Sequence, residues 1–136
     1  MSMKKSIILF TVLFLCTITS QAYSSNICEE AHKGLTETHV IFNEYFNSYI
    51  YHHNAAGNAI IRDVYPTETG NEYFLKLDCG NDVILLTKSN SGFLRELKLN
   101  QKVDFSGEAQ SWKKVFYQNS DKSYIEITLG NSSIRW

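Results

Sequence analysis

The chain has 136 residues, of which 43% are hydrophobic and 13% aromatic, and its formal net charge at pH 7 is −1. This length fits one domain, since domains typically have about 100–200 residues, and the ordinary apolar content excludes a disordered or fibrous chain. The nearly balanced charge argues against a dedicated nucleic-acid-binding protein, which would carry a strongly basic surface.

Residues 1–22 have the pattern of a secretory signal peptide. The basic start 1–5 precedes the uncharged run 6–18, and Ser20 and Ala22 place small residues at the −3 and −1 positions of a cleavage site. The uncharged run is shorter than the roughly 20 apolar residues that a membrane span needs. We therefore predict an exported protein, periplasmic or secreted, with no transmembrane segment in the mature chain.

Two alternatives to cleavage stay open. In the first, the apolar run is kept as an N-terminal anchor. In the second, Cys16 carries a lipid, although the bulky Leu15 before it matches a lipoprotein signal poorly. Cleavage after Ala22 leaves residues 23–136 as a single domain of 114 residues. Because Lys4 and Lys5 are removed, 11 basic residues then stand against 14 acidic ones, a net charge of −3.

Cleavage would also leave two cysteines, Cys28 and Cys79. An even number of cysteines in an oxidising compartment favours pairing, so we predict a disulfide between them. An intermolecular bridge and a free nucleophilic thiol are the alternatives. Closing this loop would contribute about 4 kcal/mol to stability in the chain-entropy account.

Residues 26–54 are predicted to be helical, because apolar side chains recur there at helical spacing and no proline interrupts them. The apolar positions are Leu35, Phe42, Tyr45, Phe46 and Tyr49. Asn54–Gly57 would end the helix, and Gly34 would separate a short turn at Cys28 from a longer helix. The aromatic face is expected to pack on the rest of the domain.

From Gly57 onward the spacing changes to the alternation of β-strands. The predicted strands cover residues 58–65, 72–79, 82–87 and 101–110, and a last strand buries Ile125, Ile127 and Leu129. Gly80-Asn81 predicts a hairpin turn. Residues 91–99 fit two turns of helix, with Phe93, Leu94 and Leu97 inward.

Two of these strands show which side chains should face the core. In the second strand they are Tyr73, Leu75, Leu77 and Cys79, and in the fourth they are Val103, Phe105, Gly107 and Ala109. The element order is helix, three strands, short helix, two strands. This order predicts a mainly β protein with an N-terminal helix followed by a five-stranded OB-like Greek-key barrel over residues 57–136.

The segment 57–129 resembles exported bacterial OB-fold proteins. Residues 97–108, LKLNQKVDFSGE, look like the helix-exit turn and fourth strand of such domains, and the leading helix looks like the periplasmic tRNA-anticodon-like subgroup. The resemblance implies a small binding module or envelope protein. The receptor-binding subunits of AB5 toxins share this barrel and are also secreted, although their cysteine placement is not reproduced here.

Catalytic or metal-binding motifs are not apparent. The spacing of His32, His39, His52 and His53 matches no zinc pattern, so we expect solvated or helix-capping histidines. The carboxylates that lie on predicted strands or turns are expected to be solvated; they are Asp78, Asp82, Asp104 and Glu108. No nucleophile elbow or phosphate-binding glycine loop is present. We therefore predict no enzyme activity and no cofactor.

The best candidate for a binding surface is the segment 112–117, WKKVFY. In OB-folds the loops between strands one and two and between strands four and five contact ligands, and aromatic side chains beside lysines suit stacking and charge pairing. The candidate residues are Tyr65, Trp112, Lys113, Lys114, Phe116 and Tyr117. The alternative is that Trp112 and Phe116 continue the buried face of their strand.

Two functions are compatible with these features. The first is an exported, non-enzymatic binding module that contacts a protein or cell-envelope component through barrel loops. The second is a glycan-binding subunit of a secreted oligomeric complex of the AB5-toxin type. A nucleic-acid partner is disfavoured by the net charge of −3 on the mature chain.

Overall fold

The computed structural model describes residues 27–90 and 92–136, so the predicted signal peptide, residues 1–22, lies outside the described residues. The helices are α2 (Ile27–Ala31), the 3-10 helix η1 (His32–Leu35), α3 (His39–Tyr45), the π-helical turn η2 (Phe46–Ile50) and the 3-10 helix η3 (Gly92–Glu96). The strands are β1 (Asn54–Pro66), β2 (Tyr73–Asp78), β3 (Val83–Ser89), β4 (Lys102–Phe116) and β5 (Ser123–Arg135).

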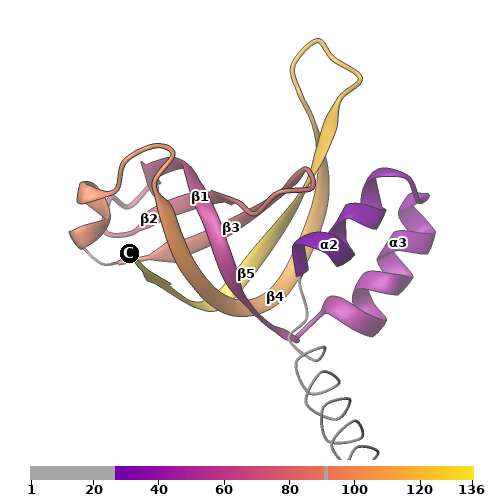
Figure 1. Cartoon of the computed structure of the whole chain (residues 1–136), viewed down its shortest axis with the longest axis horizontal. Coiled ribbons are helices and arrows are strands. Elements are labelled where there is room, and N and C mark those ends of the chain that lie inside the picture. Colours follow the sequence, from indigo (N-terminus) through magenta and orange to yellow (C-terminus); the bar gives the residue numbers. More distant parts are fainter. Residues whose placement is uncertain (1–26, 91) are drawn as a thin grey trace, which may run out of the picture.

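The five strands close into a barrel in the order β1-β2-β3-β5-β4, with β4 pairing back onto β1 (Figure 1). All neighbouring strands are antiparallel except β3 and β5, which run parallel and place Val83 opposite Ile125. A mainly β protein with five strands in a closed ring was predicted from the sequence, and this is confirmed. The closed ring pairs strand edges that an open sheet would leave exposed.

The barrel interior is filled by alternate side chains of every strand, as a period of two requires. The predicted inward faces of the second, fourth and fifth strands are confirmed in large part, while Tyr73 and Cys79 are only half-buried. The buried strand side chains are Ala55, Ala59, Ile61, Leu75, Leu77, Val83, Leu85, Val103, Phe105, Ala109, Ile125, Ile127 and Leu129. Removal of these apolar groups from water is the main favourable contribution to folding.

β1 begins earlier than predicted. Residues 54–57 were expected to end the helix, yet they form the first part of β1, where Ala55 pairs with Gly107 and Gly57 with Phe105 of β4. Ala55 is buried in the barrel core. Pairing with β4, a segment distant in sequence, therefore makes residues 54–57 part of the strand as well as the end of the helical segment.

The predicted helix over 26–54 is divided into four short pieces. The interruption lies between η1 and α3, where the hydroxyl of Thr38 caps α3 by accepting from the backbone N–H of Ile41 at 3.4 Å. Gly34, expected to divide the helix, is needed for packing: a Cβ there would lie 2.8 Å from Cδ1 of Ile125 and 2.9 Å from the ring of Phe42. η3 is also shorter than the predicted helix over 91–99.

The helical segment packs its aromatic face on the barrel. Phe42, Phe46 and Ile50 are at most 2% exposed, and Leu94 of η3 is buried with them in the same core. Figure 1 shows α2 and α3 together beside the barrel, on the side from which the β4–β5 hairpin projects. The predicted helix over 91–99 was also expected to turn Leu97 and Phe93 inward. Leu97 follows η3 and packs against the core, and the side chain of Phe93 lies outside the described part.

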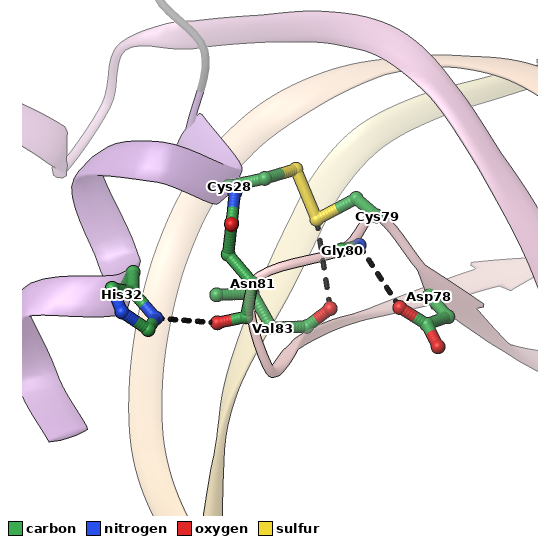
Figure 2. The surroundings of a disulfide bond; sticks show 7 residues. All are labelled: Cys28, His32, Asp78, Cys79, Gly80, Asn81 and Val83. Atoms are coloured by element: carbon green, nitrogen blue, oxygen red, sulfur yellow. Dashed lines mark hydrogen bonds between the residues drawn. A yellow bond between two sulfur atoms is a disulfide. The ribbon is translucent and has the colours of Figure 1, made fainter.

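The predicted disulfide between Cys28 and Cys79 is confirmed. It joins α2 to the β2–β3 loop, with 5.9 Å between the two Cα atoms (Figure 2). Nδ1 of His32 donates to the carbonyl oxygen of Asn81 at 2.7 Å, a second link between the same two segments. The loop turns through positive φ at Gly80, Asn81 and Asp82, which extends the predicted two-residue turn by a third residue of this kind.

We predict that the Cys79→Ser variant loses about 2–4 kcal/mol of unfolding free energy, because the helical segment is then no longer covalently held against the β2–β3 loop. The thermal midpoint of the oxidised protein should fall by several degrees, and reductant should lower that of the unmodified protein similarly. Thermal denaturation with and without reductant measures this. An equal midpoint under both conditions would show that the bridge does not stabilise the fold.

We predict that Gly34→Ala is destabilised by about 1–3 kcal/mol, since the added methyl group meets Phe42 and Ile125 in a packed core. Gly92→Ala is the matched control, because a Cβ at Gly92 meets no heavy atom of the described residues within 4 Å. Chemical denaturation of both variants compares them. Equal stabilities would contradict the close approach of η1 to β5.

Candidate functional site

Several of the histidines and carboxylates singled out in the sequence make contacts within the fold, whereas Asp82 and Asp104 are exposed. Nδ1 of His52 donates to Glu108 at 2.6 Å, and Asp78 pairs with Arg62 at 2.9 Å. The ring of His39 lies 4.8 Å from that of Trp112, measured between centroids. Within residues 27–90 and 92–136, no three His, Cys, Asp or Glu side chains are grouped so as to hold a metal ion.

Trp112 is part of the interface between the barrel and the helical segment. Its indole Nε1 donates to Oδ1 of Asn43 at 3.0 Å, and its ring meets Phe42 edge-on at 4.6 Å between centroids. The side chain is half-buried and packs against the core. Of the two roles considered for Trp112, the geometry therefore supports packing.

The two lysines point to opposite sides of β4. Nζ of Lys113 lies 3.4 Å from Oε1 of Glu126, which is buried and stands directly across the β4–β5 pair. Nζ of Lys114 donates to the carbonyl oxygen of Leu35 at 3.3 Å and lies 5.6 Å from the ring centroid of Phe116. Lys113 therefore neutralises a buried carboxylate, and Lys114 links the hairpin to η1.

Phe116 and Tyr117 differ from Trp112 because they are exposed. Phe116 is 61% exposed and Tyr117 49% exposed, at the point where β4 turns toward β5. The ring of Tyr117 lies 5.2 Å from that of Tyr124, and its backbone N–H donates to Lys122 at 2.9 Å. We call residues 116–124 the hairpin tip. It projects beyond the barrel in Figure 1.

Tyr65 lies elsewhere. It lies at the end of β1, beside the β1–β2 loop, and its ring centroid is 5.4 Å from that of Phe74. The β1–β2 loop adjoins the Ser89 end of β3, since Tyr73 pairs with Ser89, whereas β5 leaves the hairpin at the Val83 end. The structure therefore does not bring Tyr65 together with the segment 112–117.

A groove that the sequence did not reveal lies between β3 and β5. Pairing of these strands ends at Leu86 and Thr128, and beyond this point they enclose a volume of about 580 Å³. The lining residues are Glu72, Phe74, Leu86, Thr87, Lys88, Ser89, Asn90, Gln110, Thr128, Leu129, Gly130, Asn131 and Ser132. We call it the β3–β5 groove. Since Tyr65 contacts Phe74, it stands next to this groove, away from the hairpin tip.

None of the helices formed by the described residues is both long and apolar enough to cross a membrane. No protein-family model matches the chain, and no curated protein matches it. A solved structure, an aspartyl tRNA synthetase from Entamoeba histolytica, is similar over 74% of this chain and 21% of its own, with 18% sequence identity and a TM-score of 0.40. This chain thus spans about a fifth of the length of the synthetase.

We predict that Trp112→Ala loses about 3 kcal/mol of stability, because it removes the ring that packs on Phe42. Trp112→Phe should lose about 1 kcal/mol, since it keeps a ring but leaves Asn43 without its donor. Phe116→Ala, the exposed control four residues further along the same face of β4, should stay within about 0.5 kcal/mol of the parent. Chemical denaturation measures all three, and equal losses for Trp112→Ala and Phe116→Ala would contradict the packing role.

Proposed function

We propose that this chain is an exported, non-enzymatic binding module with a Greek-key barrel of the OB type, and that it contacts a protein or cell-envelope component through the hairpin tip. The observation that carries the proposal is the exposure of Phe116 and Tyr117 on a projecting hairpin. Large aromatic side chains grouped at the surface are typical of interaction sites, where they supply contact area at low entropic cost.

The hairpin tip is held in place by the strands beneath it. β4 and β5 pair without a gap from Trp112–Ile127 to Phe116–Ser123, so the two aromatic residues extend from regular sheet. At its base, Trp112 contacts the helical segment and Lys114 donates to Leu35. Such a support keeps the aromatic side chains in one position before binding, which lowers the entropy that a partner must overcome.

The charges around the hairpin tip favour a partner with an apolar depression and acidic groups beside it. Lys114 lies next to the ring of Phe116, and Lys122 is exposed in the loop that follows Tyr117. Asp121 in the same loop reduces the local positive charge. This mixture fits specific contact with a protein better than the broad attraction of a nucleic acid.

Export and fold type rest on separate observations. A disulfide suits an oxidising compartment, in agreement with the signal-like segment 1–22. The strand order β1-β2-β3-β5-β4, the parallel β3–β5 pair and the position of η3 between β3 and β4 support a barrel of the OB type.

We predict that the double variant Phe116→Ser, Tyr117→Ser loses at least tenfold in affinity for its partner, because two exposed aromatic side chains contribute more than about 1.4 kcal/mol to the free energy of binding. Its thermal midpoint should stay close to that of the parent. Affinity capture from an envelope extract of the source cells, with mass spectrometry, identifies the partner, and titration of the purified pair measures the affinity. Leu99→Ser is the matched control, since Leu99 is 65% exposed and lies outside the hairpin tip. An unchanged affinity in the folded double variant would refute this site.

A further inference from the structure

We propose that the β3–β5 groove is a second binding site, and that it takes a neutral saccharide. This site is independent of the hairpin tip, because the tip adjoins the Val83 end of β3 and the groove lies beyond Leu86, toward Ser89. The proposal rests on the shape of the groove, on how its walls are built, and on the chemistry of its lining.

The shape follows from the way the two strands separate. β3 pairs with β5 only from Val83 to Leu86 and then continues along β2 to Ser89. β5 continues along β4, so the two strands move apart and leave a groove of about 580 Å³. That volume lies within the range of roughly 300–1,000 Å³ that small-molecule sites occupy.

Two irregularities of the β4–β5 pair shape the wall of the groove. One extra residue, Gln110, is inserted in β4, and the register of β5 shifts at Asn131, which has a φ of 49°. Bulges of this kind change the direction of side chains and are common beside functional sites. Here both of the bulged residues line the groove.

Gly130 is the position that makes this arrangement possible. A Cβ at Gly130 would lie 1.8 Å from Nε2 of Gln110, so the amide of Gln110 lies directly over the backbone of β5. Any other residue at Gly130 would displace it. The glycine therefore leaves room for a side-chain amide at the groove.

The lining provides hydrogen-bonding groups that both donate and accept. Asn90, Gln110 and Asn131 carry amides, and Thr128 and Ser132 carry hydroxyls. Amides and hydroxyls can each pair with a ligand hydroxyl in either direction, which is the requirement for recognising a sugar. The ring of Phe74 adds an apolar surface at the same groove, suited to the C–H face of a sugar ring.

Thr87 shows that hydrogen-bonding capacity in the groove is unused. It is 1% exposed, and its hydroxyl has no hydrogen-bond partner among the described residues. A buried hydroxyl without a partner is unfavourable and is retained in few places, commonly where a ligand or a bound water satisfies it. Thr87 lies in the wall of the groove, one residue beyond Leu86, the last residue of β3 that pairs with β5.

The charge of the groove favours a neutral ligand. Its lining contains one acidic and one basic side chain, Glu72 and Lys88, and these pair with each other at 3.0 Å. Because the two charges lie side by side, the lining has no net charge and gives a charged ligand no net electrostatic attraction. Neutral sugar hydroxyls can accept from Lys88 or donate to Glu72 while the pair stays intact.

The experiment is a two-dimensional amide NMR titration of the purified, oxidised protein with neutral oligosaccharides, namely maltotetraose, cellotetraose and fully N-acetylated chitotetraose, followed by a glycan array. We expect at least one neutral glycan to shift the amide signals of residues 86–90 and 128–132. Gln110→Ala and Gly130→Ala should each weaken its affinity by about tenfold, since both remove the same hydrogen-bonding amide from the groove.

Thr87→Val distinguishes a ligand site from a structural one. Valine keeps the shape of threonine, so the variant should weaken saccharide binding by about fivefold without lowering the thermal midpoint, because the lost hydroxyl has no partner within the described fold. Thr36→Val, on the exposed surface of the helical segment, is the matched control and should leave saccharide binding unchanged. A lowered midpoint with unchanged saccharide affinity would overturn the role of Thr87.

The remaining outcomes are equally decisive. Three results would each overturn the proposal. They are no binding of any neutral glycan at millimolar concentration, binding of acidic glycans alone, and shifts of these amide signals caused only by extended peptides. The Phe116→Ser, Tyr117→Ser variant separates the two sites, since it should bind the saccharide with unchanged affinity. Loss of saccharide binding in that variant would show that the groove and the hairpin tip do not act independently.

Discussion

The contact between the helical segment and the barrel is the constraint on which the rest of the structure depends. Phe42 lies at its centre, packed edge-on against Trp112 of β4 and close to Gly34, which lets η1 approach Ile125. A helical segment made of such short pieces has little stability alone, since isolated helices need about 12–15 residues to persist in water. Its conformation therefore comes from burial of one aromatic face against the strands.

Two further links hold this contact from either side. The disulfide between Cys28 and Cys79 joins α2 to the β2–β3 loop, and the bond from Trp112 to Asn43 joins β4 to α3 (Figure 2 shows the first). The two surfaces proposed for binding, the hairpin tip and the β3–β5 groove, lie outside this contact.

These two surfaces suit different ligands for a structural reason. The hairpin tip is convex and presents exposed aromatic rings, which fit a depression in a larger partner. The β3–β5 groove is concave and lined with amides and hydroxyls, which fit a small polar ligand. Because they adjoin opposite ends of β3, a partner at one need not obstruct the other. The two proposals together describe a module that would recognise a glycan at the groove and a protein at the hairpin tip.

The disulfide could be predicted from the even number of cysteines in an exported chain. The helical character of the first segment and the alternation that buries Val103, Phe105 and Ala109 could be predicted from the spacing of apolar residues along the chain. The different environments of Trp112, which packs, and Phe116, which is exposed, became clear only from the folded chain, because both residues lie on one face of β4. The helical segment covers the first position and ends before the second. The β3–β5 groove was equally hidden, because local alternation says which face a residue takes but not where two strands distant in sequence cease to pair.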